Sequence, residues 1–261
     1  MNAFREKLAS GKRLLGTHVN LCDYRICEIL GSIGFDYLWI DMEHLSTSLH
    51  DMEMHLIAAK AAGTPTLVRV CWNDVPHIKR VLEAGPDAIV IPMINSVEEA
   101  KRAIDTCVYP PEGKRGFGPF RAVGYGVNDV NEYIQKGSLD MCRFLQIETK
   151  QAVLAMDEMA RIPHVDGFII GPMDMSGSIG RLGDCYAGET DGLIELAIQK
   201  ARTAGLPIGL SIGSDAEGEL THWFDKGFDM LSASTDVWSV IRGARELLAM
   251  MRRVSLERDG R

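Results

Sequence analysis

Two acidic residues follow apolar, strand-like runs near the middle of the chain. Phe144–Ile147 ends directly at Glu148, and Phe168–Ile170 leads through a short turn to Asp174. If these runs are neighbouring strands of a parallel barrel, their carboxyl ends meet at the face where barrel enzymes carry their active sites. Two carboxylates there suit a hard divalent cation, which prefers oxygen ligands. The alternative for each acid is helix N-capping or pairing with a helix dipole.

A second polar group lies earlier in the chain. Asp41, Glu43 and His44 follow a candidate strand, and Arg69 stands inside an otherwise apolar run. His44 could be a general base whose tautomer is fixed by Asp41, a zinc ligand, or a plain surface-loop histidine. An arginine among apolar neighbours needs a partner. Arg69 therefore either holds an oxyanion or substrate carboxylate at the barrel mouth, or pairs outward with a helix acid.

The turn before Asp174 is a candidate anion site. Gly171, Pro172 and Met173 open a helix-like segment, and the first N–H groups of a helix have no carbonyl partner within it. We expect the carboxylate of an α-keto acid there, with phosphate as the competing ligand. No Gly-x-x-x-x-Gly-Lys-Ser/Thr or Gly-x-Gly-x-x-Gly motif accompanies the strands, which disfavours nucleotide cofactors.

The elements that must position these residues alternate along the whole chain. Short apolar runs are followed by longer amphipathic stretches, several of which stop at a glycine. This rhythm predicts an α/β fold in which eight βα units close into a TIM (β/α)8 barrel. The predicted strands are Leu15–Val19, Tyr37–Ile40, Thr66–Val70, Ala88–Ile91, Phe144–Ile147, Phe168–Ile170, Ile208–Leu210 and Met230–Leu231.

Two segments depart from the rhythm. Residues 109–128 are rich in proline and glycine, and their length predicts a functional loop or lid. Lys114, Arg115 and Arg121 in this loop could attract an anionic substrate, although a solvated loop explains them equally well. The tail, Val237–Arg253, predicts a final amphipathic helix.

Composition limits the class of protein. The 261 residues carry a formal net charge of -8, which argues against nucleic-acid or membrane-surface partners. No apolar run is long enough to span a membrane, and the N-terminus lacks a signal-peptide pattern. The six cysteines form no Cys-x-x-Cys pair, which favours buried thiols and a cytoplasmic location over zinc or redox motifs.

Together these residues resemble the HpcH/HpaI aldolase family, the metal-dependent class II pyruvate aldolases that include 4-hydroxy-2-oxoheptanedioate and 2-dehydro-3-deoxyglucarate aldolases. The resemblance runs in register from about Gly16 to about Leu247. It is carried by the segments 34–37, 41–44, 67–70, 72–74, 91–93, 109–116, 146–149 and 165–174.

The resemblance implies a barrel of the phosphoenolpyruvate/pyruvate-binding type spanning residues 1–261 as one domain. It also implies a divalent metal (Mg²⁺, Mn²⁺ or Co²⁺) and a homo-hexamer built as a trimer of dimers. The C-terminal helices, about residues 235–253, would be exchanged with a neighbouring subunit.

Roles can be carried over residue by residue. By resemblance, Glu148 and Asp174 hold the metal, and His44, oriented by Asp41, is the acid–base residue. Arg69 steadies the enolate oxygen. The remaining implied site residues are Glu83, an acid near a subunit interface, and the substrate-binding residues Gln146, Gly171, Pro172, Met173, Asp174, His18 and Leu210.

The implied reaction makes or cleaves 4-hydroxy-2-oxo acids, with pyruvate or oxaloacetate and an aldehyde as small-molecule partners. No lysine lies in a predicted strand, so no Schiff base is expected. His18 stands where the family often has tryptophan and, with Arg121, could select the aldehyde. The alternatives are a lyase acting on phosphoenolpyruvate or CoA esters, as in citrate lyases, and a non-catalytic keto-acid sensor.

Overall fold

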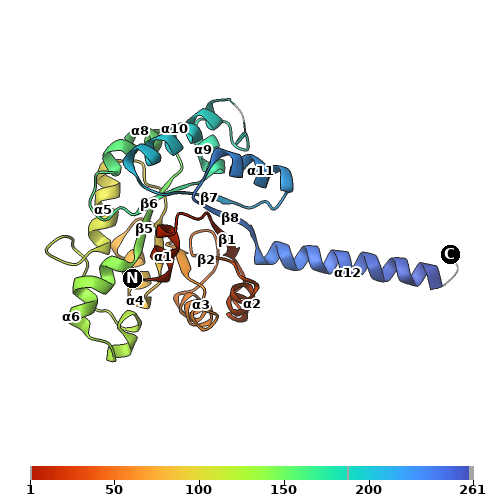
Figure 1. The fold of residues 1–261 in the computed structure, drawn as a ribbon, viewed down its shortest axis with the longest axis horizontal. Coiled ribbons are helices and arrows are strands. Elements are labelled where there is room, and N and C mark those ends of the chain that lie inside the picture. The colour runs from red at the N-terminus through yellow and green to blue at the C-terminus, as the bar shows by residue number, and fades with distance from the viewer. Residues whose placement is uncertain (1, 187, 259–261) are drawn as a thin grey trace.

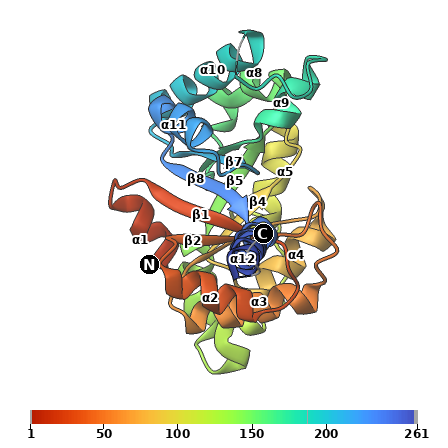
Figure 2. The ribbon, with the colours of Figure 1, turned by 90° about the vertical axis from the view of Figure 1, so that its right-hand side faces the viewer.

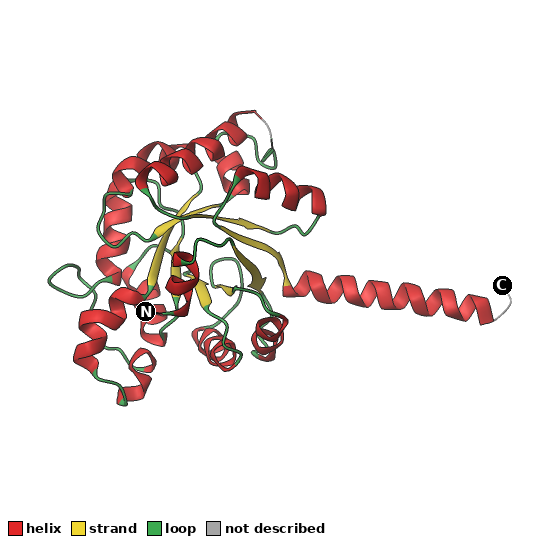
Figure 3. Ribbon diagram, in the orientation of Figure 1, coloured by secondary structure: helices red, strands yellow, loops and turns green. Residues whose placement is uncertain are grey.

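The computed structural model describes residues 2–186 and 188–258. Its strands form one closed, all-parallel barrel in the order β1 to β8, with β1 paired to both β2 and β8 (Figures 1 and 3). The strands are β1 Leu14–Val19, β2 Tyr37–Asp41, β3 Thr66–Arg69, β4 Ala88–Ile91, β5 Cys142–Ile147, β6 Gly167–Ile170, β7 Ile208–Ile212 and β8 Met230–Thr235. The prediction of an eight-stranded TIM barrel is confirmed, with strand ends shifted by a few residues.

Helices surround the barrel (Figure 3). They are α1 Ala3–Ala9, α2 Arg25–Ile33, α3 Leu49–Ala61, α4 Val75–Ala84, α5 Val97–Cys107, η1 Arg121–Gly126, α6 Val130–Glu132, η2 Tyr133–Gly137, α7 Ser138–Asp140, α8 Lys150–Met159, α9 Pro172–Ser178, α10 Gly188–Ala204, α11 Glu217–Lys226 and α12 Asp236–Arg258. No helix in the described part of the chain is both long and apolar enough to cross a membrane.

Side-chain alternation along the strands creates two cores. One lies between the barrel and its helices, and the other fills the barrel interior. Leu67 and Phe144 belong to the interior core. Because strand side chains alternate, Arg69 and Gln146, two residues further along, face the same interior at the C-terminal ends of their strands.

The opposite end of the barrel is closed by α1. Phe4 of this helix is fully buried and packs edge-on against Tyr37 and Phe144, with ring centroids 5.4 and 5.9 Å apart. Asn2 donates to the backbone carbonyls of Asp87 and Asp140, which lie near the starts of β4 and β5. The open mouth is therefore the C-terminal face.

The local helix signals explain how the chain leaves that face. Asp74, Ser96 and Thr149 each cap the helix that follows a strand, accepting a hydrogen bond from a backbone N–H in its first turn. At the far end of α4, Gly85 adopts a φ of 72° and stops the helix. These caps hold the residues between strand and helix at the mouth of the barrel.

The last helix, α12, leaves the barrel and projects away from it (Figures 1 and 2). It has 23 residues, of which only Asp236 is buried. Its large apolar side chains are exposed: Trp238, Val240, Leu247, Leu248, Met250, Met251, Val254 and Leu256.

Candidate active site

The mouth of the barrel holds a cavity of about 450 Å³. The predicted site residues that line it are His44, Arg69, Gln146 and the turn Gly171 to Asp174. The rest of its wall is made by Cys185, Tyr186, Ser211, Ile212, Gly213, Ser214, Glu219 and Trp223.

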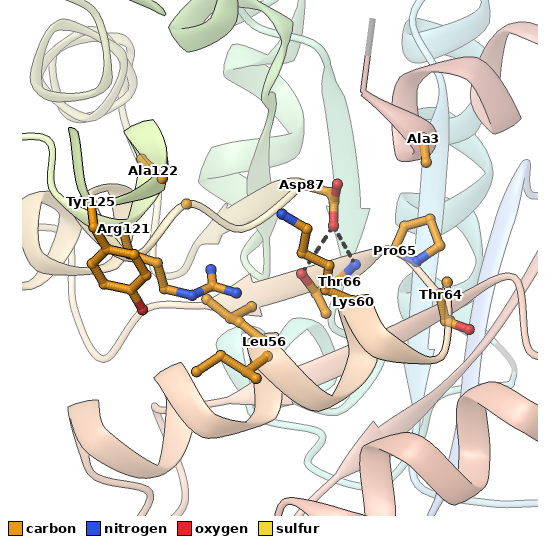
Figure 4. Close-up of a pocket in the computed structure, with 14 residues that line it drawn as sticks. Ala3, Leu56, Lys60, Thr64, Pro65, Thr66, Asp87, Arg121, Ala122 and Tyr125 are labelled. Carbon is orange, nitrogen blue, oxygen red and sulfur yellow. Dashed lines mark hydrogen bonds between the residues drawn. The ribbon is translucent and has the colours of Figure 1, made fainter. Parts of the chain in front are cut away.

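A second cavity, of about 560 Å³, lies at the opposite end of the barrel (Figure 4). Lys60, Asp87 and Arg121 line it, together with residues at the start of β3. The Asp87 carboxylate there accepts hydrogen bonds from the backbone N–H and the hydroxyl of Thr66. None of the predicted site residues lines this cavity except Arg121, so the candidate site is the cavity at the mouth.

Glu148 follows β5 directly and is buried. Its Oε1 accepts from Gln146 Nε2 at 2.6 Å, and its Oε2 accepts from the backbone N–H of Met93 at 3.0 Å. Met93 reaches this position with a φ of 56°, in the left-handed region. Burial, together with the nearby charges of Glu43 and Asp174, raises the pKa of Glu148 to about 7.

Asp174 lies in the first turn of α9, which follows β6. The N-cap of α9 is Gly171 and the N-cap of α8 is Thr149, so neither Glu148 nor Asp174 caps a helix. A Cβ atom at Gly171 would lie 2.9 Å from Glu148 Oε1. Only glycine therefore lets the turn approach Glu148 this closely.

Asp41, Glu43 and Arg69 form a buried ion network. Arg69 Nε and Nη2 donate to the two carboxylate oxygens of Asp41, each at 2.8 Å, and Arg69 Nη1 lies 3.0 Å from Glu43 Oε2. Burial opposes ionisation of Asp41, yet the Arg69 guanidinium lowers the pKa of this carboxyl overall. Burial raises the pKa of Glu43 to about 7, and the charges of Asp41 and Asp174 add to this effect.

This network corrects one predicted contact. Among the described residues, Asp41 forms no hydrogen bond or ion pair with His44. Its two carboxylate oxygens accept from Arg69, and Oδ1 also accepts from the backbone N–H of Glu43. The nearest acid to His44 is Glu43, with Nε2 and Oε2 3.7 Å apart. The imidazole is largely exposed at the rim of the cavity, with 63% of its side chain accessible.

His18, on β1, lies beneath the cavity instead of lining it. Its Nδ1 is 2.7 Å from the carbonyl of Ser234, and its Nε2 is 2.9 Å from the hydroxyl of Ser211. Burial lowers the pKa of His18 to about 4, so the ring is neutral near pH 7. His18 therefore reaches the cavity only through Ser211, which lines it.

The acids fit a divalent cation. No group of three or more His, Cys, Asp and Glu side chains in residues 2–186 and 188–258 is arranged to hold a metal. Glu148 and Asp174 remain the predicted pair of ligands. Beside them, the buried Oε1 of Gln146 has no hydrogen-bond partner among the described residues. The raised pKa values of Glu148 and Glu43 and an acceptor without a donor at Gln146 describe surroundings that a bound cation would stabilise.

Two further predicted residues lie away from the cavity. Leu210 packs in the core between the barrel and the helices and does not line the cavity, so the structure does not support its predicted substrate contact. The prediction took Leu210 as the end of its strand, but β7 continues to Ile212. Glu83, near the end of α4, lies 3.8 Å from Lys79 Nζ and does not line the cavity within one chain.

The segment predicted as a functional loop or lid lies away from the mouth. The chain from 109 to 128 joins the end of α5 to the region before β5, so it lies at the N-terminal face of the barrel. Arg121 donates to the backbone carbonyl of Ala84, and Lys114 pairs with Asp105 at 3.0 Å. Within one chain, these cations do not reach the cavity at the mouth.

Sequence reasoning also missed several residues of the site. Glu43 lies in the predicted 41–44 run but received no role of its own. Met93 follows β4, and its position at a strand end was the only sequence signal that its backbone N–H could belong to the site. Tyr186 and Glu219 lie outside any recognisable motif, and only the fold brings them to the cavity.

Comparisons with known proteins agree with this geometry. A family model described as HpcH/HpaI aldolase/citrate lyase matches residues 15–242. A hydroxypyruvate/pyruvate aldolase of Roseovarius nubinhibens is 34% identical, covering 96% of this chain and 97% of the relative. A 4-hydroxy-2-oxo-heptane-1,7-dioate aldolase of Klebsiella pneumoniae is 33% identical, covering 95% of this chain and 93% of the relative.

A solved structure is similar over the same extent. An HpcH/HpaI aldolase/citrate lyase family protein from Burkholderia cenocepacia J2315 superimposes with a TM-score of 0.89 at 27% identity, covering 97% of this chain and 100% of that one. The residues matched by the family model, 15–242, include Arg69, Glu148 and Asp174. The chain belongs to the HpcH/HpaI aldolase/citrate lyase family.

Proposed function

We propose that this protein is a metal-dependent pyruvate aldolase, a carbon–carbon lyase that makes or cleaves 4-hydroxy-2-oxo acids. The observation that carries the proposal is the pair of acids after β5 and β6. Asp174 lines the same cavity as Arg69, and the buried Glu148 lies near enough for the charges of Asp174 and Arg69 to act on its pKa. Aldolase-named relatives that match nearly the whole chain support the same reaction class.

Glu148 and Asp174 would hold the divalent cation, with Mg²⁺, Mn²⁺ and Co²⁺ as candidates. When bound, the cation supplies Lewis-acid polarisation of the keto acid, which is pyruvate or oxaloacetate. Gln146 positions Glu148 through the hydrogen bond to Oε1.

Arg69 and the first turn of α9 would bind different oxygens of the keto acid. Arg69, whose guanidinium is fixed by Asp41, directs positive charge toward the oxygen that becomes the enolate. The first-turn N–H groups of Met173 and Asp174, after Gly171 and Pro172, bind the carboxylate of the keto acid.

The proton balance assigns a role to His44. In the addition direction, the pyruvate methyl group loses a proton, a bond forms to the aldehyde carbon, and the aldehyde oxygen gains a proton. In cleavage, the 4-hydroxyl group loses its proton as that bond breaks. His44, at the rim of the cavity, is the group that we assign to proton transfer at this oxygen.

We further propose that the chain works as a single-domain subunit of a homo-hexamer, a trimer of dimers. The exposed apolar side chains of α12 support exchange of this helix with a neighbouring subunit. Glu83 would then lie near a subunit interface. All six cysteines are free, which suits the cytoplasm that we propose as the location.

A coupled assay tests the reaction class. Purified protein with added Mn²⁺ or Mg²⁺ should release pyruvate from 4-hydroxy-2-oxo acids, followed by oxidation of NADH with lactate dehydrogenase. Release should stop with a chelator and return with metal. Cleavage of CoA esters without release of pyruvate from any 4-hydroxy-2-oxo acid would overturn the proposal in favour of a citrate-lyase-like enzyme.

A further inference from the structure

The cavity has a wall that the keto-acid chemistry does not use. It is formed by Ser211 and Ser214 at the end of β7, by Glu219 on α11, and by Tyr186 before α10. In an eight-stranded barrel, β7 lies across the mouth from β3, which carries Arg69. The carbonyl compound that meets the enolate would therefore extend toward this wall.

The hydroxyl proton of Ser211 has a fixed direction, toward His18. The carbonyl of Ser234 can only accept, so the bond to His18 Nδ1 requires a proton on that nitrogen. A neutral imidazole then has an unprotonated Nε2, which must accept the hydroxyl proton of Ser211. Ser211 Oγ thus presents lone pairs, and no donor proton, to the cavity.

Glu219 gives the wall a second acceptor. The hydroxyl of Tyr186 donates to Glu219 Oε2, and no group in the described part of the chain donates to Oε1. The Tyr186 ring is itself fixed against Trp223, with ring centroids 5.5 Å apart. The wall therefore holds two hydrogen-bond acceptors that line the same cavity, the Glu219 carboxylate and the Ser211 hydroxyl.

The wall offers no lysine or arginine that could bind an anion. Among the lining residues, Arg69 is the only lysine or arginine, and its guanidinium is engaged by Asp41 and Glu43. A carboxylate on the incoming aldehyde would face the like charge of Glu219 and the acceptor side of Ser211, with only the neutral hydroxyl of Ser214 on this wall left to donate to it. A hydroxyl group could donate to either.

We propose that the Ser211–Glu219 wall selects an uncharged hydroxyaldehyde as the carbonyl partner and rejects aldehydes that carry a carboxylate. The inference rests on the proposed aldolase function and adds the class of its second substrate. His18 acts here as a positioning residue that fixes the direction of the Ser211 hydroxyl.

Three aldehydes of equal carbon number test the proposal. They are glyceraldehyde, propanal, which lacks its hydroxyl groups, and 2-hydroxy-3-oxopropanoate, which has a carboxylate in place of the terminal CH₂OH. With pyruvate and Mg²⁺, kcat/KM should be highest for glyceraldehyde, by about tenfold or more over each of the others, the factor for one hydrogen bond to a charged group. Equal or higher kcat/KM for the carboxylate aldehyde would overturn the inference.

Variants of the wall residues then test which side chains cause the aldehyde preference. Glu219→Gln should reduce the preference of glyceraldehyde over the carboxylate aldehyde by about tenfold, as expected when one unit charge is removed several ångströms away. Ser211→Ala should reduce the preference over propanal. Glu217→Gln, on the exposed side of the same helix, is the matched control and should keep the wild-type ratios. Unchanged ratios in Glu219→Gln and Ser211→Ala would also overturn the inference.

Exchange of the pyruvate methyl protons with deuterium, measured on the same preparations, distinguishes failure of the aldolase function from failure of the proposed aldehyde selection. No exchange in the wild type would refute the aldolase function itself. Exchange with the wrong aldehyde preference would refute only the assignment of this wall.

Discussion

Arg69 shows how the site depends on one residue's geometry. Its guanidinium is buried, makes two parallel hydrogen bonds to Asp41, and stacks over Trp39 at 5.5 Å. Lysine keeps the charge but cannot form this planar pair. The residue is therefore fixed in direction as well as in charge, as electrostatic stabilisation of an enolate requires.

Replacing this arginine tests the role. Arg69→Lys should lower kcat about 10²-fold or more, the cost of removing one preorganised donor to a developing oxyanion. Steady-state kinetics that separate kcat from KM are the measurement. A variant with normal kcat and only a raised KM would show that Arg69 binds substrate without stabilising the enolate.

Glu148 predicts an unusual pH dependence of stability for the protein without metal. Its pKa rises from 4.5 to about 7 in the folded chain, first because of burial and then because of Glu43 and Asp174. The folded state thus binds this proton more tightly than the unfolded state. The resulting stabilisation is fully present below about pH 4.5 and is lost as the pH rises through 7.

Melting temperatures measured from pH 5 to 8 without metal test this linkage. Relative to wild type, Glu148→Gln should become more stable as the pH rises, while the exposed Glu217→Gln should follow the wild type. Because ligand carboxylates must be ionised, added Mn²⁺ should raise the wild-type melting temperature more at pH 8 than at pH 5. Parallel curves for wild type and Glu148→Gln would contradict the raised pKa.

At the level of elements, the connections decide which face each loop serves. A strand-to-helix turn lies at the C-terminal mouth, and a helix-to-strand loop lies at the other end. The turn from β6 to α9 therefore brings Gly171 beside Glu148, while the chain from 109 to 128 packs near Ala84 and Gly85. Composition and length marked residues 109–128 as functional, and the opening of a helix marked the turn before Asp174; the order of the elements shows which face of the barrel each one serves.

The helix α12 yields a prediction about assembly. Leu247, Met251 and Val254 recur at helical spacing on one exposed stripe. Leu247→Glu combined with Met251→Glu should reduce the molar mass in solution, measured by light scattering after gel filtration. Arg252→Glu, on another face, is the control and should keep the wild-type mass. A monomer molar mass for both the wild type and the double variant would contradict the proposed hexamer.

For the whole molecule, periodicity predicted the fold well. Eight buried strands recur at regular intervals, and glycine stops and helix caps mark the units between them, so local signals and the closed barrel agree. Glu148, Asp174 and Arg69 could be picked out because they lie within or just after recognisable strands, and the family resemblance then gave each a role.

The remaining features depend on three-dimensional contacts that sequence spacing does not encode. Asp41 and His44 are near in sequence, yet Arg69 on the next strand competes for the same carboxylate and binds it in two places. Leu210 faces the helices because side chains alternate along β7, so that Ile208, Leu210 and Ile212 share the outer core and Ser211 faces the cavity. Tyr186 and Glu219 come together from separate segments only after the barrel has closed.

The central claim is that the carboxylates of Glu148 and Asp174, with a divalent cation, make the methyl protons of pyruvate acidic. The most direct measurement is the exchange of these protons with deuterium from D₂O, followed by mass spectrometry of pyruvate alone with the protein and Mg²⁺. We predict exchange that a chelator stops, that metal restores, and that Glu148→Gln and Asp174→Asn lose while remaining folded. Exchange that persists in both variants, or that proceeds equally in excess chelator, would contradict the account.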